Sequence, residues 1–200
     1  IVRYNSNGSL DNSFDTDGKL TISIGFAQDE AALAIQANGN ILIAGSNGSN
    51  FIAARFNANG SLDNTFDGDG IAITPVGIAS SAEATSMEIE TDGKILVAGF
   101  AFVAPGRDFA LVRYNSNGSL DISFDGDGKV TTHIAGNDYA ESIKISGSRI
   151  YLGGISNNNV FTVVAYQNSS VVPLQLISFS GKNINNKVQL SWVTENEINT

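Results

Sequence analysis

The chain is 200 residues long, contains no cysteine and has a formal net charge of −9 at pH 7. The absence of cysteine excludes disulfide bonds, thiolate metal sites and cysteine nucleophiles. The acidic balance disfavours nucleic acid or an anionic membrane as a partner. The sequence has no apolar run that approaches the roughly 20 residues of a membrane-spanning helix, so we expect no membrane insertion.

The first element in the chain is a polar phrase that occurs twice more. It covers residues 3–19 (RYNSNGSLDNSFDTDGK), and its near-copies cover residues 55–70 and 113–129. Apolar phrases recur in a fixed order between the copies, beginning with ILIAG at residues 41–45 and FIAARF at residues 51–56. This order indicates a repeated supersecondary unit of 52 to 58 residues.

Each unit is predicted to hold four short strands, which in the first unit cover residues 19–25, 31–37, 40–45 and 51–57. The pair Asn38-Gly39 joins the second strand to the third, and such pairs favour the positive φ angles of a hairpin turn. The third strand is apolar on both faces, which indicates a sheet that is packed on both sides. Four antiparallel strands in such a sheet predict an all-β fold made of β-propeller blades. A β-helix is the alternative, although the unit is long for one of its coils.

The repeats resemble the delta-60 repeat family, whose units are expected to form propeller blades. The resemblance rests on the phrase RYNSNGSLDNSF, the Gly-Lys pair and apolar strand after it, and then NGNILIAG or DGKILVAG. It covers about residues 1–167. One departure is FDGDG, where the family more often has glycines or small residues in place of the aspartates.

The repeat divides residues 1–167 into propeller segments. Residues 1–18 are predicted to be the end of an upstream blade, because the chain opens in the last strand of a unit. Residues 19–57, 71–115 and 129–167 are predicted to be three complete blades. Propellers typically have 4–8 blades, so we expect a fragment of a longer protein, with the missing blades of the same chain as partners.

Residues 168–200 lack the repeat and are predicted to be a linker and the start of a second β domain. Two alternating strands flank an Asn-rich turn there, and Pro173 marks the boundary. VPLQLISFSG and LSWVTENEIN are similar to a sandwich-like segment near the C-terminus of many secreted Bacteroidota proteins, ahead of a type IX sorting domain. This resemblance implies an extracellular or cell-surface protein.

Candidate catalytic residues are few. His133 is the single histidine, so a Ser-His-Asp triad would have to include it; the favoured interpretation is a partly exposed strand residue. Several carboxylates precede the second strand of a unit and could form pairs suited to glycoside hydrolysis: Asp29, Glu83, Asp138 and Glu141. Acidic residues in such places usually face solvent, and we therefore predict no catalytic residue.

The polar phrase is predicted to contain a structural ion pair. Its arginine and aspartate keep a spacing of eight residues in all three copies, at Arg3/Asp11, Arg55/Asp63 and Arg113/Asp121. The corresponding positions of the last unit, Ala165 and Pro173, have lost both partners together. An Arg beside an Asp-capped turn would satisfy donors in the loop; alternatively, the Asp only caps its own turn. Apolar side chains of the phrase are expected to bury the same loop: Leu10, Leu62, Leu120, Phe14, Phe66 and Phe124.

The acidic end of the phrase, FDGDG at residues 66–70, resembles the first half of an EF-hand calcium loop, with Asp67 and Asp69 on ligand positions. The first and last ligand positions then fall on Thr65 and Val76, which excludes an EF-hand. The favoured interpretation is an Asp-Gly turn that needs no ion. The sequence thus predicts no metal site and no cofactor.

The sequence favours a non-catalytic repeat scaffold, or a binding or adhesion module of a secreted or cell-surface bacterial protein. A propeller presents loops at its two ends, and function lies in such loops. A surface glycan or another protein is the expected partner, and the binding residues are unknown. The alternative is part of a propeller enzyme, such as a carbohydrate-active hydrolase that uses loop carboxylates. Residues 102–108 (FVAPGRD) are the conspicuous irregularity among the loops.

Overall fold

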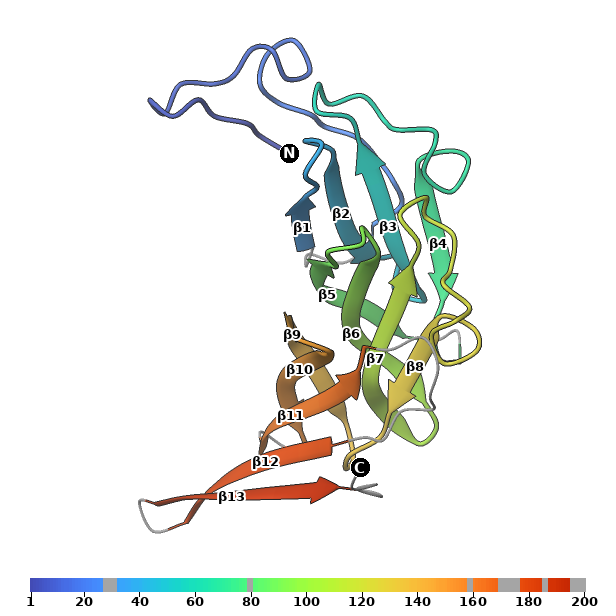
Figure 1. Ribbon diagram of the computed structural model, residues 1–200, viewed down its shortest axis with the longest axis vertical. Helices are drawn as coiled ribbons and strands as arrows, with labels where there is room; N and C mark the ends of the chain where they lie inside the picture. The colour runs from blue at the N-terminus through green and yellow to red at the C-terminus, as the bar shows by residue number, and fades with distance from the viewer. Residues whose placement is uncertain (27–31, 79–80, 158–159, 169–176, 185–186, 195–200) are drawn as a thin grey trace.

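The structure is a computed structural model that describes residues 1–26, 32–78, 81–157, 160–168, 177–184 and 187–194. The secondary structure of these residues is all β, as the sequence predicts, and consists of three antiparallel sheets that follow one another along the long axis of the molecule (Figure 1). None of the described segments is a helix long and apolar enough to cross a membrane.

Each sheet takes its strands in chain order. The first contains β1 (Ala32–Ile35), β2 (Ile41–Ser46), β3 (Asn50–Phe56) and β4 (Ile71–Pro75). The second contains β5 (Ala82–Ile89), β6 (Ile95–Val103), β7 (Gly106–Tyr114) and β8 (Lys129–Thr132). The third contains β9 (Asp138–Ser146), β10 (Arg149–Ser156), β11 (Val160–Gln167), β12 (Ile177–Ile184) and β13 (Lys187–Thr194).

The grouping of strands into sheets differs from the predicted blades 19–57, 71–115 and 129–167. The strand that follows each polar phrase pairs with the strand before it, so β4 pairs with β3 and β8 with β7. Near the start of the chain, Lys19 likewise forms a bridge with Val2. The physical reason is that the phrase reverses the chain, which brings its two flanking strands side by side in one sheet.

The third sheet also includes strands from residues 168–200, the segment predicted to be a linker and the start of a second β domain. The predicted hairpin is present as β12 and β13, which pair along their whole length. It does not form the start of a separate sheet, because β12 pairs with β11, for example Val163 with Phe179. The hairpin therefore occupies the place that β4 and β8 hold in the other two sheets and adds a fifth strand (Figure 1). The predicted boundary residue Pro173 lies outside the described residues.

Two apolar cores lie between consecutive sheets, and the strand β6 contributes to both. Val97 belongs to the core shared with the first sheet, whereas its neighbour Leu96 belongs to the core shared with the third. Successive side chains of a strand point to opposite faces. This alternation confirms the prediction that the apolar phrase ILVAG is packed on both sides.

Polar contacts also join the sheets inside these cores. The hydroxyl of Tyr114 in β7 donates a hydrogen bond of 2.7 Å to Thr74 Oγ1 in β4, and that of Tyr166 in β11 donates one of 2.8 Å to Thr132 Oγ1 in β8. Burial raises the pKa of both tyrosines. The same pair of residue types thus recurs at both junctions, which fixes how one sheet sits on the next.

A β-bulge in the first strand of two sheets explains the glycine that ends the apolar phrase. In the third sheet the register between β9 and β10 shifts between Gly153 and Gly154, which leaves Glu141 as the extra residue. A Cβ atom at Gly154 would lie 2.0 Å from the backbone oxygen of Tyr139. The bulge therefore brings two backbones so close that only glycine fits.

Candidate functional site

The predicted ion pair of the polar phrase forms in all three copies. The Nε atom lies 2.8 Å from the Asp oxygen in Arg3–Asp11, 2.7 Å in Arg55–Asp63 and 2.8 Å in Arg113–Asp121. The last contact is an ion pair without hydrogen-bond alignment. The aspartate also caps its own turn, since Asp63 Oδ1 accepts the backbone N–H of Thr65 at 3.1 Å. The aspartate therefore does both things that the sequence suggested: it pairs with the arginine and it caps its own turn.

The guanidinium groups also reach across to the next sheet. Arg3 Nη1 donates to the carbonyl of Ala58, and Arg55 Nη1 donates to that of Ser116 at 2.5 Å. Two backbone bonds join the same phrases, because the Asp15 amide donates to Asn59 O at 2.9 Å and the Asp67 amide donates to Asn117 O at 2.7 Å. We call this set of contacts between consecutive phrases the inter-blade clip.

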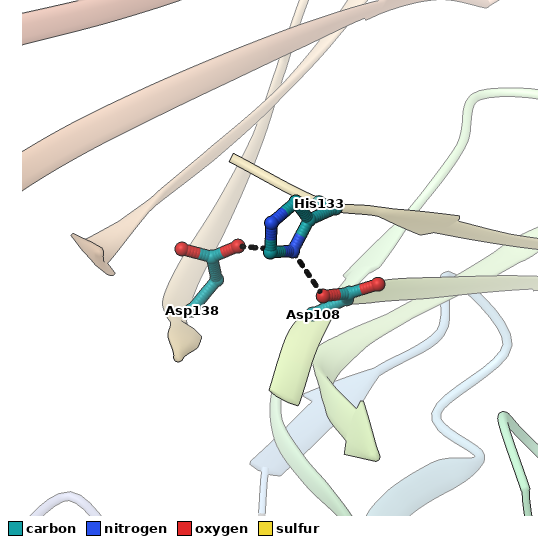
Figure 2. Close-up of side chains that lie close together, drawn as sticks. All are labelled: Asp108, His133 and Asp138. Carbon is teal, nitrogen blue, oxygen red and sulfur yellow. Dashed lines mark hydrogen bonds and ion pairs between the residues drawn. The ribbon is translucent and has the colours of Figure 1, made fainter. Parts of the chain in front are cut away.

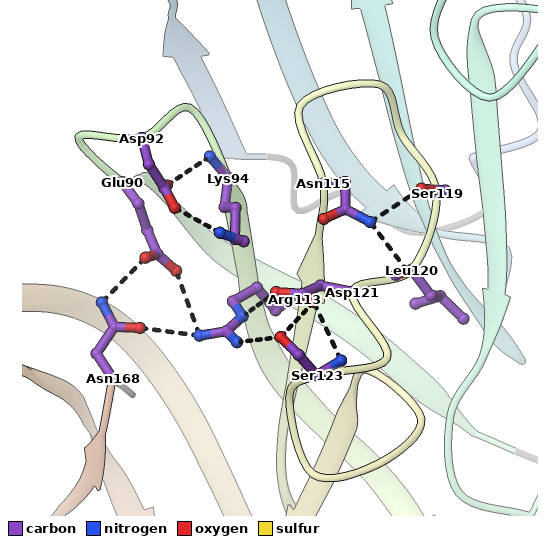
Figure 3. Close-up of polar contacts among 10 residues, drawn as sticks. All are labelled: Glu90, Asp92, Lys94, Arg113, Asn115, Ser119, Leu120, Asp121, Ser123 and Asn168. Carbon is purple, nitrogen blue, oxygen red and sulfur yellow. Dashed lines mark hydrogen bonds and ion pairs between the residues drawn. The ribbon is translucent and has the colours of Figure 1, made fainter. Parts of the chain in front are cut away.

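The last copy of the phrase is joined to the chain in a different way. Arg113 Nη1 donates to Asn168 Oδ1 at 3.0 Å, and the Asn168 amide donates to Glu90 Oε2 at 3.0 Å (Figure 3). Asn168 follows β11, where the other sheets have a phrase. One side chain therefore takes over the contact that a backbone carbonyl of the next phrase makes elsewhere.

The aromatic residues of the phrase support the clip, and the leucines do so only in part. Each arginine lies over a phenylalanine ring at 4.4 to 4.9 Å, within the range of a cation–π contact: Phe14, Phe66 and Phe124. These rings are buried as predicted. Leu10, Leu62 and Leu120 are only half-buried, because they lie at the outer side of the turn and bridge to the strand before it.

The capping aspartates have lowered pKa values. For Asp63 the largest cause is the hydrogen bond from the Thr65 hydroxyl; burial opposes it, and the charge of Arg55 adds to it. An aspartate with a lowered pKa in the folded state stabilises the protein at neutral pH, and this contribution is lost as the pH falls through that pKa. The clip is thus a structural device at neutral pH.

The acidic end of the phrase is a turn. Asp69 Oδ1 accepts the backbone N–H of Ile71 at 2.9 Å, and Asp17 and Asp127 do the same for Lys19 and Lys129. These bonds are the Asp-Gly turn favoured from the sequence. Asp67 lies in the left-handed region with φ at 49°.

The substitution Asp67→Asn should raise the urea midpoint at pH 7. Burial first and then the charge of Asp69 raise the pKa of Asp67, so ionising this group costs stability in the folded state. Asparagine removes the charge and tolerates a positive φ angle. The gain should shrink as the pH falls through this raised pKa, because the wild-type carboxyl then becomes protonated as well. A variant that is less stable at pH 7, or that loses a stabilisation by Ca²⁺, would contradict the ion-free turn.

A second polar cluster lies at the opposite end of the strands, between the second and third sheets. His133 Nδ1 lies 2.8 Å from Asp108 Oδ1 and 3.7 Å from Asp138 Oδ2 (Figure 2). Asp108 is near the start of β7, His133 directly follows β8, and Asp138 begins β9. The chain thus brings three different segments to one point.

The carboxylates of this cluster are buried and the imidazole is not. Asp138 is fully buried and Asp108 is 4% exposed, whereas the His133 side chain is 51% exposed. Backbone N–H groups of Ile134 and Ala135 hold Asp138 at 2.7 and 3.3 Å, and the Ser156 hydroxyl donates to the same carboxylate. The hydrogen bond with Asp108 is the largest cause that raises the pKa of His133.

The cluster contains only part of what sequence reasoning singled out. His133 and Asp138 lie together, and His133 is partly exposed as predicted, although it directly follows β8 instead of lying within a strand. Glu83 lies in β5 opposite Phe100, and Glu141 is the exposed extra residue of the β9 bulge. Asp29 lies outside the described residues. Asp108 ends the irregular segment 102–108, but no pattern in the sequence linked it to His133.

One signal in the sequence could have identified the cluster. The strand registers place Asp108, His133 and Asp138 at positions equivalent to Asn50, Pro75 and Ala82 of the preceding junction. All three positions change to a side chain that can bind a proton or a cation. Aligning one repeat with the next by their strand registers brings out these three changes together.

The chemistry open to the cluster follows from its donors. An imidazole nitrogen and two carboxylate oxygens lie within 4.8 Å of one another and are all metal-ligating atoms. Glycoside hydrolysis is poorly served, because the imidazole stands between the carboxylates and both of these are buried. The nearby Ser156 hydroxyl is not placed to act as a nucleophile with His133, since it is buried and donates to Asp138.

The sequence comparisons agree with the fold. Three segments, residues 1–14, 36–66 and 90–124, match a family described as a domain of unknown function (DUF5122) β-propeller. Each segment ends at the buried phenylalanine of the polar phrase, so the match includes the arginine and aspartate of the clip. Comparisons with curated proteins and with solved structures find no match. The chain is therefore built from β-propeller repeats.

Proposed function

We propose that this chain is a non-catalytic β-propeller scaffold that presents one set of loops for binding. The observation that supports this proposal is the use of the repeated phrase: its arginines contact the next phrase, and its aspartates accept hydrogen bonds within their own phrase. This end of the sheets, where the phrases lie, is the clip end. The other end, with the β6–β7 hairpin and the β8–β9 connection, is the loop end.

The loop end supports the binding role because the repeats differ there. It contains the irregular segment 102–108, which ends at Asp108, and the Asp108–His133–Asp138 cluster. The hydrolase alternative has less support among the described residues. A groove of about 280 Å³ lies between β4 and β8. Its lining includes the carboxylate of Asp127, but this carboxylate forms an ion pair with Lys129 at 3.4 Å, so the groove does not offer the pair of carboxylates that glycoside hydrolysis uses.

We further propose a secreted or cell-surface location in a bacterium, exported by a type IX system. The support is the resemblance of residues 171–200 to the segment that precedes type IX sorting domains. The partner expected in that location is a surface glycan or another surface protein. Antibodies against the chain should label intact cells of the source bacterium, and label confined to permeabilised cells would refute this location.

The binding role is tested with a glycan array and a pair of matched variants. Ala104 lies at the exposed tip of the β6–β7 hairpin, and Ala58 is exposed at the clip end. Ala104→Arg should abolish binding to the glycans that the wild-type chain retains, whereas Ala58→Arg should preserve it. Hydrolysis of a bound glycan or equal loss in both variants would refute the proposal, and an array that retains no glycan would exclude a glycan as the partner.

A further inference from the structure

The Asp108–His133–Asp138 cluster carries an excess of negative charge. Among the described residues, His133 is the only basic group within 4 Å of either carboxylate. Arg107 is the neighbour of Asp108 in the chain, but its guanidinium lies over the rings of Phe100 and Tyr139 and donates to the Tyr139 hydroxyl. One imidazole therefore faces two buried carboxylates, and even its protonated form balances only one of them.

The junction between the sheets does not require this cluster. The first junction has the same strand order and registers, with Asn50, Pro75 and Ala82 in the equivalent places. A junction of this kind therefore forms with neutral side chains. The cost of burying two carboxylates beside each other at the second junction has no counterpart in the repeat, which points to a ligand for these groups.

We propose that Asp108, His133 and Asp138 bind a divalent transition-metal ion, with Zn²⁺ as the preferred ion. Bonds of about 2.0–2.2 Å from nitrogen and oxygen to Zn²⁺ require ligand atoms a little more than 3 Å apart. The distances from His133 Nδ1, 2.8 and 3.7 Å, lie on either side of that value. A small rotation of the half-exposed ring would bring both carboxylate oxygens into reach.

The surroundings suit such an ion. Backbone N–H groups and Ser156 hold the Asp138 carboxylate in place, and such outer contacts orient the ligands of metal sites. Solvent reaches the exposed side of His133 and can supply the fourth ligand. The imidazole favours Zn²⁺ over Ca²⁺ and Mg²⁺, which prefer oxygen ligands alone. Zn²⁺ held here would tie the second sheet to the third.

The composition of the chain makes the test clean. The sequence contains one histidine and no cysteine, so the imidazole signals of untagged protein belong to His133, and no thiolate competes for the metal. Titration calorimetry should show one Zn²⁺ bound per chain, and nuclear magnetic resonance should show shifts of the His133 ring at the same stoichiometry. Ca²⁺ and Mg²⁺ should leave the ring signals unchanged.

Two variants separate a site from general attraction of cations to an acidic protein. His133→Ala removes a half-exposed ligand, so the fold should survive while the affinity for Zn²⁺ falls at least about tenfold. Glu141→Gln removes an exposed carboxylate of the same strand as Asp138 and should leave the affinity unchanged. The proposal would be overturned if wild-type protein and His133→Ala bound Zn²⁺ with equal affinity, or if the His133 ring signals did not shift when Zn²⁺ was added.

Discussion

Replacing Arg55 by methionine should lower the free energy of unfolding by about 3 kcal/mol, because removing one partner of a buried ion pair leaves the other charge uncompensated. The side chains of Arg55 and Asp63 are only 10% and 9% exposed. Methionine keeps much of the packing on Phe66 but loses the contacts with Asp63, Thr65 and Ser116. Urea denaturation measures the loss without screening the charges.

The first copy of the phrase provides a matched control. Arg3 makes the same contacts, but its side chain is 33% exposed and that of Asp11 is 23% exposed. Exposed ion pairs contribute at most about 1 kcal/mol, so Arg3→Met should cost much less than Arg55→Met. If both variants lose the same small amount, the buried ion pair is not a source of stability.

The substitution Gly154→Ala should lower the free energy of unfolding by about 3 kcal/mol, as much as Arg55→Met. Gly153→Ala should change it by less than about 1 kcal/mol. A Cβ at Gly154 would lie 2.0 Å from the backbone oxygen of Tyr139, so β9 and β10 would have to separate. A Cβ at Gly153 would meet only the Ser142 hydroxyl, at 3.1 Å, and a hydroxyl can rotate away. Urea midpoints of the two variants give the comparison.

The two glycines are adjacent in one strand, so they share strand propensity and distance from the sheet edge, although Gly154 is buried and Gly153 is only partly buried. Gly154→Ala therefore reports the close approach of β9 at the bulge, and Gly153→Ala is the control for adding a methyl group to this strand. Equal stability of the two would show that β9 and β10 do not approach each other as closely as the structure has them. Gly99→Ala should repeat the effect in the second sheet, where the Cβ would lie 1.9 Å from the backbone oxygen of Glu83.

Local patterns in the sequence predicted the strands and the ion pair. The alternation of phrases located most of the strands, and the joint loss of Arg and Asp in the last unit pointed to their contact. The grouping of strands was wrong, because a repeat has no visible starting point. A strand such as residues 71–75 lies between two units and can be assigned to either, and only pairing with β3 decides the matter.

The Asp108–His133–Asp138 cluster could not be predicted from the sequence for a different reason. Its members come from three segments, and Asp108 lies 25 residues from His133. No local spacing links them, and they meet only because β7, β8 and β9 arrive at the same end of two sheets. The inter-blade half of the clip was hidden for the same reason, since Arg55 contacts a carbonyl 61 residues away.

Hydrogen exchange of the Asp67 amide tests the inter-blade clip most directly. This amide lies outside the strand pairing of its own sheet and donates across the junction to Asn117 O at 2.7 Å. We expect it to exchange at least about 100-fold more slowly than an unprotected amide in the wild-type chain, and to lose much of this protection in Arg55→Met. Exchange at the unprotected rate in the wild-type chain would show that consecutive phrases are not joined and would contradict the clip.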